Sequence, residues 1–232
     1  MVDVNRHKFF LLQVLKDIYA DTELASSLGF KGGTALMLFH DLPRFSVDLD
    51  FNLIKNSSDK PVYDKIRNIL AGYGTIHDEV RKHYGMLLVL NYEDGDRNLK
   101  VEISNRTYPD EYEIKDYLGI SMKVMNLECM FTHKFMALLD RSSLTSRDVF
   151  DCWFCMKQRL ALRRSILELR LNSSFEDYID RSIELVANIK SNRILDGMGE
   201  LLDPDVKKWV KISLVSEFTA LARIYKEMKL IK

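Results

Sequence analysis

The sequence predicts two domains, a mixed α/β (α+β) domain over residues 1–125 and an all-helical domain over residues 126–232. Short strand-like runs with alternating apolar residues occur only in the first half of the chain. From about residue 125 onward, apolar residues recur at helical spacing. With 232 residues, of which 47% are hydrophobic, the chain is long enough to bury a substantial core.

The elements expected in the first half alternate between helices and strands. Helical spacing of apolar residues predicts a helix over 5–20 and a second short one that Gly29 ends, and Pro43 ends a third over 35–40. Strands are expected at 47–53, 86–92 and 98–104, a loop at 56–61 and an amphipathic helix at 62–74. The dipeptide Asp94-Gly95 predicts that the last two strands form a hairpin.

The second half contains four expected helices, at 127–141, 145–160, 175–190 and 204–228. Thr145 or Ser146 is the expected N-cap of the second of these helices, because a side-chain oxygen at this position accepts a hydrogen bond from a free backbone amide.

Composition excludes several classes of protein. Thirty-four basic residues balance thirty-four acidic ones, so any contact with nucleic acid must depend on a local patch. Three cysteines are too few for a disulfide framework, and we interpret Cys152 and Cys155 as two helix positions without a redox or zinc role. No secretory signal or membrane-spanning run is visible, which favours a cytoplasmic protein that does not contact a membrane.

Two carboxylates mark a candidate metal site. On a strand, Asp48 and Asp50 point to one face while Val47, Leu49 and Phe51 point to the other. Adjacent carboxylates on a rigid strand suit a hard divalent cation such as Mg²⁺. Glu102 could supply a third carboxylate if its strand is a neighbour, and the alternative is a solvated strand face.

A candidate phosphate site lies just before these carboxylates. Gly32 and Gly33 leave the backbone amides unobstructed at the start of a helix, and Thr34 is a plausible N-cap or first-turn residue. The N-terminal end of a helix attracts anions, which predicts phosphate binding here.

These motifs together resemble those of the abortive-infection type (AbiEii/AbiGii-like) nucleotidyltransferase toxins of type IV toxin–antitoxin systems, in the DNA polymerase β-like superfamily. KGGTAL followed by PRFSVDLDF resembles the opening signature of that family. The resemblance implies that Lys31, Gly32, Gly33, Thr34, Arg44 and Ser46 bind the nucleotide. For Arg44 and Ser46 the alternative is that they brace the turn before the strand.

Two later segments resemble the family in kind and order. FTHKFMALLDR matches a helix that carries Lys134, Ala137 and Arg141, and SRDVFD matches a helix that carries Arg147, Asp148 and Asp151. The resemblance implies that Lys134 contacts the triphosphate, that Asp148 acts in catalysis, and that Arg147 and Asp151 lie near the nucleotide.

Ordinary helix chemistry offers alternatives for these segments. Lys134 and Arg141 share a helix face, and so do Asp148 and Asp151. The two aspartates could instead cap the helix and pair with Arg147. We interpret His133, which points about 100° away from Lys134, as a structural histidine.

The predicted function is a metal-dependent nucleotidyltransferase that uses Mg²⁺ or Mn²⁺ on Asp48, Asp50 and Glu102. It would move a nucleoside monophosphate from a nucleoside triphosphate (NTP) to an acceptor. The resemblance implies a toxin whose acceptor is RNA, a tRNA 3′ end, and whose partner is a cognate antitoxin. Two alternatives stay open: a nucleotidyl- or phosphotransferase that modifies a protein, and a non-catalytic nucleotide- or RNA-binding module with the same fold.

Basic residues after Asp151 could contact the phosphates of a tRNA, although such runs are often only solvated faces. They form two groups: Lys157, Arg159, Arg163, Arg164 and Arg170, and Lys207, Lys208 and Lys211.

Overall fold

The computed structural model describes residues 3–54, 59–93, 98–140 and 143–232. The chain forms two compact units. The first comprises Met1–Asp41, Phe45–Thr107 and Glu111–Asn126, and the second comprises Leu42–Arg44, Tyr108–Asp110 and Leu127–Lys232. The predicted division at 125/126 stays a prediction, and two short segments from the first half of the chain belong to the second unit.

The first unit is built on a seven-stranded mixed sheet with strand order β3-β4-β5-β2-β1-β7-β6. Strand β1 (Leu28–Lys31) is antiparallel to β2 (Asp48–Leu53) and parallel to β7 (Ile120–Met125). Strand β2 is parallel to β5 (Leu99–Ser104). The remaining neighbours are antiparallel: β3 (Thr75–Lys82) with β4 (Gly85–Asn91), β4 with β5, and β6 (Tyr112–Tyr117) with β7.

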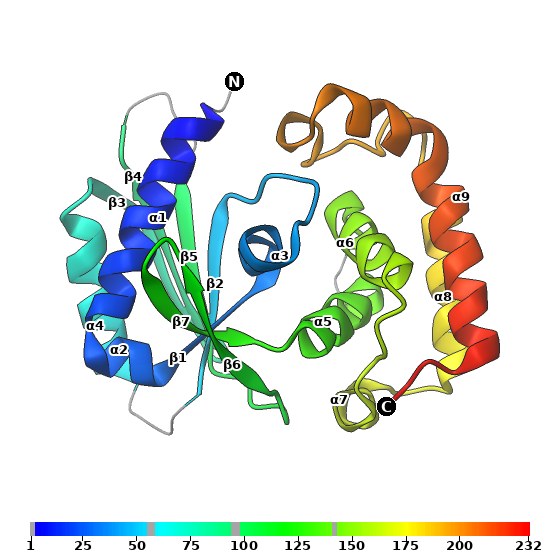
Figure 1. The fold of residues 1–232 in the computed structure, drawn as a ribbon, viewed down its shortest axis with the longest axis horizontal. Helices are drawn as coiled ribbons and strands as arrows, with labels where there is room; N and C mark the ends of the chain where they lie inside the picture. The colour runs from blue at the N-terminus through cyan, green and yellow to red at the C-terminus, as the bar shows by residue number, and fades with distance from the viewer. Residues whose placement is uncertain (1–2, 55–58, 94–97, 141–142) are drawn as a thin grey trace. The chain divides into compact units, whose positions relative to one another are not determined.

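Helices cover both faces of this sheet (Figure 1). Helices α1 (Val4–Ala20), α2 (Thr22–Ser27) and α4 (Asp59–Ala71) lie on one face, and α3 (Gly32–His40) lies on the other. The Tyr19 ring of α1 packs against Phe51 of β2, so the apolar face of β2 contributes to the core beneath α1. The other face of β2, which carries Asp48 and Asp50, is on the side of α3.

Side-chain caps define where several helices begin. Asp3 accepts a hydrogen bond from the Arg6 amide at the start of α1, and Asp21 accepts from the Glu23 and Leu24 amides at the start of α2. Helix α3 ends at His40, and Asp41 takes a left-handed conformation with φ 55°.

The second unit is helical, with α5 (Leu127–Asp140), α6 (Ser146–Lys157), α7 (Arg164–Arg170), α8 (Phe175–Ala187), the 3-10 turn η1 (Gly199–Leu201) and α9 (Pro204–Met228). The indole rings of Trp153 in α6 and Trp209 in α9 pack in a tilted arrangement, with centroids 4.2 Å apart and an angle of 38° between their planes. Glu217 accepts a hydrogen bond from each indole N–H. Cys152 and Cys155 are both buried in α6, and burial raises the pKa of each thiol.

The predicted fold class is confirmed, a mixed sheet with helices followed by a helical region. The structure adds β1, β3, β6, β7 and α7, which the sequence patterns did not predict. Helix α4 begins at Asp59, within the expected loop, because Pro61 is tolerated in the first turn of a helix. The predicted Asp94-Gly95 turn lies outside the described residues. Within the described ranges, no helix has the length and apolar character to cross a bilayer.

Candidate active site

Three carboxylates share one face of two neighbouring strands in the first unit. Asp48 and Asp50 are half-buried, whereas Leu49 and Phe51 on the opposite face of β2 are fully buried. Strand β5 runs parallel beside β2, and its Glu102 lies directly opposite Asp50. The condition for a third carboxylate, that the two strands are neighbours, is therefore met.

Gly32 lies against the Asp50 carboxylate. Its φ is +81°, a backbone conformation that residues other than glycine rarely adopt. A Cβ atom at this position would stand 2.3 Å from Asp50 Oδ2. Gly32 is therefore required for two reasons, the backbone conformation and the space that the Asp50 carboxylate occupies.

The N-terminal end of helix α3 adjoins the same strand. Lys31 is the N-cap residue and makes no side-chain capping hydrogen bond, and in the sheet it lies opposite Asp50. Thr34, in the first turn, is fully buried and donates its hydroxyl hydrogen to the carbonyl oxygen of Asp48. Thr34 therefore fixes the start of α3 to the start of β2, and Gly33 beside it is also buried.

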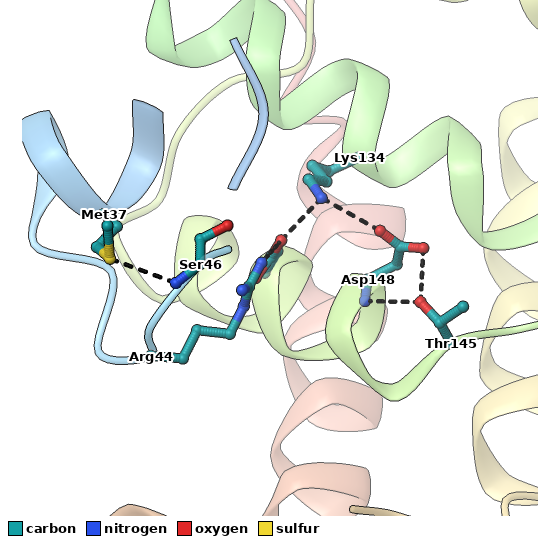
Figure 2. A network of polar contacts seen from close by, with 7 residues as sticks. Met37, Arg44, Ser46, Lys134, Thr145 and Asp148 are labelled. Carbon is teal, nitrogen blue, oxygen red and sulfur yellow. Dashed lines mark hydrogen bonds and ion pairs between the residues drawn. The ribbon is translucent and has the colours of Figure 1, made fainter. Parts of the chain in front are cut away.

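The turn before β2 is held by two different contacts. The Ser46 amide donates to the Met37 sulfur at 3.3 Å, within the first unit (Figure 2). Arg44 belongs to the second unit, where its guanidinium donates two hydrogen bonds of 2.7 Å to the two carboxylate oxygens of Asp151. Both residues are buried, and the contacts agree with the bracing alternative.

A buried network of ion pairs lies in the second unit (Figure 2). Lys134 Nζ is 2.9 Å from Asp151 Oδ2 and 3.3 Å from Asp148 Oδ1. Two cations and two carboxylates thus alternate in the order Arg44, Asp151, Lys134 and Asp148. The side chain of Asp151 is fully buried and that of Lys134 is 18% exposed.

Opposite charges in this network outweigh the effect of burial on both central groups. Burial by itself would lower the pKa of Lys134, but Asp151 and Asp148 raise this pKa above its usual value. Burial would likewise raise the pKa of Asp151, but Arg44 and Lys134 lower it from 3.8 to about 2. Both groups are therefore charged at neutral pH.

The first turn of α6 holds Asp148 in place. Thr145 is the N-cap residue as predicted: its hydroxyl oxygen accepts from the Asp148 amide at 3.2 Å, and its hydroxyl hydrogen is donated to Asp148 Oδ2 at 2.7 Å. The described contacts pair Asp151 with Arg44 and Lys134, whereas the sequence suggested Arg147 as the partner. Arg147 is half-buried in the first turn of α6, and Arg141 lies outside the described residues.

A family model described as nucleotidyl transferase AbiEii toxin of a type IV toxin–antitoxin system matches residues 13–209. The chain belongs to this family. The protein is therefore a nucleotidyltransferase toxin, as its motifs predicted. No curated protein sequence matches the chain.

Two solved structures from Helicobacter pylori resemble the toxin along most of both chains. The first is JHP933, with 19% identity, a TM-score of 0.57 and coverage of 97% of this chain and 92% of the other. The second is a candidate nucleotidyltransferase, with 20% identity, a TM-score of 0.59 and coverage of 97% and 95%. At these identities the likeness shows a shared fold.

The two sets of predicted site residues are thus each brought together within one unit of the toxin. Asp48, Asp50 and Glu102 share a strand face in the first unit, and Arg44, Lys134, Asp148 and Asp151 form the network in the second. Among the described residues, no three His, Cys, Asp or Glu side chains are grouped closely enough to hold a metal ion by themselves.

The toxin also contains a polar cluster that the sequence did not reveal. His133 Nε2 lies 2.7 Å from Asp110 Oδ1, and Nδ1 lies 2.7 Å from Arg170 Nη1. Because arginine can only donate, Nδ1 accepts and Nε2 donates to Asp110. Both ring nitrogens are engaged, as expected for a structural histidine. Arg170 also pairs with Asp140, and Arg163 pairs with Glu128, so two residues of the first basic group serve ion pairs within the unit.

Proposed function

We propose that this toxin transfers a nucleoside monophosphate from an NTP to the 3′ end of an RNA, with Asp48, Asp50 and Glu102 as the metal-binding carboxylates. The observation that carries the proposal is the register of β2 and β5. It places Glu102 opposite Asp50, on the face that also carries Asp48. Carboxylates on paired central strands are held rigidly, which a metal-dependent transferase requires.

The donor set fits Mg²⁺ or Mn²⁺. Mg²⁺ is usually bound through one or two carboxylates, while waters and substrate phosphates complete its coordination. A bound divalent cation would neutralise charge on the triphosphate and hold the leaving group in line.

The N-terminal end of α3 supports triphosphate binding beside these carboxylates. Its first backbone amides lack a side-chain cap from Lys31, and helix N-termini attract anions. Gly32 lets the phosphates approach the backbone closely on the side that carries Asp50. We assign Lys31, Gly32 and Gly33 to this phosphate site, with Thr34 as the residue that fixes the helix to β2.

The proposed reaction is an in-line displacement at the α-phosphorus. The acceptor hydroxyl oxygen forms a new bond to phosphorus, the bond from phosphorus to the bridging oxygen breaks, and pyrophosphate leaves. Glu102 accepts the hydroxyl proton or completes the metal site. The roles of Lys134 and Arg147 at the triphosphate, and of Asp148 and Asp151 near the nucleotide, are part of the same proposal and rest on the family resemblance.

Membership of a toxin family supports the choice of partners. We propose a tRNA 3′ end as the acceptor, a cognate antitoxin as the regulator and the cytoplasm as the site of action. A protein acceptor would use the same carboxylates and nucleotide site, so the experiment must identify the labelled molecule.

The decisive experiment compares the wild type with Asp48→Asn and Asp50→Asn. Each purified protein is incubated with each α-labelled NTP, Mg²⁺, RNA and cell protein, and the label is followed on denaturing gels. Both variants should abolish transfer because the amide keeps the shape of the side chain and removes the charge that binds the cation.

Asp78→Asn on β3 is the matched control, because it removes an exposed strand carboxylate away from β2. It should transfer label as well as the wild type, and circular dichroism should show that all three variants are folded. Normal transfer by either β2 variant would refute the metal assignment. Label on protein alone would replace the RNA acceptor with a protein, and release of no pyrophosphate would indicate a binding module.

A further inference from the structure

A hollow in the first unit adjoins the carboxylate face. It has a volume of about 390 Å³ and is lined by residues of the β3–β4 turn, the start of β4 and the end of β5. Glu102 is one of the lining residues, together with Leu87, which lies opposite Glu102 in the β4–β5 pairing. The hollow therefore begins where the row of carboxylates ends.

The rim of this hollow carries an exposed aromatic side chain beside a cation. Tyr84 is 56% exposed, and the Arg106 guanidinium lies 4.8 Å from the centre of its ring. The His83 and Tyr84 rings form a T-shaped pair with centroids 4.5 Å apart. Exposed aromatic rings that stack on bases, with arginines that contact the phosphates, are the usual means of binding single-stranded nucleic acid.

Backbone contacts fix this group of side chains relative to Glu102. The Asn105 amide donates to the Tyr84 carbonyl at 3.2 Å, and the Asn105 side-chain amide donates to the His83 carbonyl at 3.3 Å. At Gly85, which has φ +150°, a Cβ atom would stand 2.3 Å from the carbonyl oxygen of Ile103. The turn is thus held tightly against the end of β5, so Tyr84 and Arg106 are preorganised.

The order of strands separates this hollow from the proposed phosphate site. Helix α3 follows β1, on one side of β2, whereas the hollow lies on β5 and β4, on the other side of β2. The carboxylates of β2 and β5 lie between the two. Since the triphosphate is assigned to the α3 side, a ligand in the hollow approaches the carboxylates from the acceptor side.

We propose that the hollow beside Glu102 binds the terminal nucleotides of a single-stranded RNA, with a base stacked on Tyr84 and a phosphate paired with Arg106. This inference rests on the proposed function, because it assigns the acceptor of the same site. It places the 3′ hydroxyl of the RNA toward Glu102. Tyr84 and Arg106 are positioning residues for the acceptor and take no part in the chemistry.

The experiment measures RNA binding without transfer. A fluorescein-labelled single-stranded RNA of ten nucleotides is titrated with the full chain in the absence of NTP, and its anisotropy gives Kd. Tyr84→Ala should weaken binding by about 5- to 100-fold, the range for loss of one stacked base. Tyr84→Phe should bind as the wild type does, because it keeps the ring. Arg106→Ala should weaken the dependence of Kd on salt concentration, by the amount expected for the loss of about one phosphate contact.

Phe9→Ala is the matched control, since Phe9 is also exposed, at 57%, but lies on α1. It should leave Kd unchanged, and a duplex of the same sequence should bind Tyr84→Ala and the wild type equally because its bases are stacked internally. Failure of the wild type to bind the RNA, or equal affinity of Tyr84→Ala and the wild type, would overturn the proposal. A raised Kd of Tyr84→Ala for NTP with an unchanged Kd for the RNA would do the same, because it would assign the hollow to the incoming base. These readings do not depend on whether transfer to RNA occurs, so they separate this proposal from the proposed function.

Discussion

At the scale of single residues, Gly32 links backbone conformation to the chemistry of the site. We predict that Gly32→Ala destabilises the first unit by more than the cost of the backbone conformation, about 1–2 kcal/mol. The added Cβ atom must also displace the Asp50 carboxylate, which stands 2.3 Å from its position. A displacement of this kind should lower the transfer rate by about 100-fold.

Gly119→Ala provides a close control. Gly119 has φ +78°, near the +81° of Gly32, but a Cβ atom there would meet nothing within 4 Å. Thermal melts followed by circular dichroism should show that Gly119→Ala lowers the stability by the cost of the backbone conformation alone. This variant should keep full transfer activity. Equal activity of the two alanine variants would show that the position of Asp50 does not depend on Gly32.

The lowered pKa of Asp151 predicts that the stability of the protein depends on pH in the acid range. Its pKa is lowered from 3.8 to about 2 in the folded protein, so it binds a proton less readily than in the unfolded chain. The stabilising contribution, about 2 kcal/mol, is therefore present above pH 4 and is lost as the pH falls from 4 to 2. The stability difference between wild type and Asp151→Asn should shrink over that interval.

This difference can be measured by urea unfolding followed by tryptophan fluorescence. The chain has two tryptophans, Trp153 and Trp209, and both belong to the second unit. Asp180→Asn is a suitable control, because Asp180 forms an exposed pair with Lys226 and should contribute at most about 1 kcal/mol. A difference that stays constant down to pH 2 would contradict the low pKa of Asp151.

At the scale of elements, the sequence predicts the helices and strands whose apolar residues follow a clear local spacing. Apolar residues alternate along β2 and β5 and form an unbroken run in β4, and they recur at helical spacing in α5, α6 and α9, so these elements were found. The strands β3 and β6 form the two edges of the sheet and carry polar side chains on both faces, which hides the alternation. Strand β1 has only four residues.

The same reasoning explains how much of the candidate site could be predicted. Asp48, Asp50 and Glu102 could be found because each follows the period of its own strand, and only their register needed the structure. The pairing of Arg44 with Asp151 could not be found, since it joins residues 107 positions apart. The Tyr84 and Arg106 pair also depends on strand pairing, because a turn and a strand end meet only in the folded sheet.

At the scale of the whole molecule, the segment Leu42–Arg44 adds a cation to the helical unit from a distant part of the chain. We predict that Arg44→Met destabilises this unit by about 3–5 kcal/mol, because it leaves more negative than positive charge in the buried network. Adding Asp151→Asn to Arg44→Met should restore stability, although Asp151→Asn alone destabilises the wild type.

Urea unfolding followed by tryptophan fluorescence measures all four proteins of this double-mutant cycle. A coupling free energy near zero would show that the two side chains do not depend on each other. Lys226→Met breaks the exposed pair with Asp180 and serves as a control, because the loss of such a pair should lower the free energy of unfolding by at most about 1 kcal/mol.

The Arg44–Asp151 pair also sets a time order during synthesis on the ribosome. Residue 44 is made 107 residues before residue 151. At about 5–20 residues per second, this interval lasts roughly 5–20 s. The helical unit therefore cannot neutralise the buried Asp151 carboxylate with Arg44 until residue 151 has been made, so Arg44 lacks this partner during that interval.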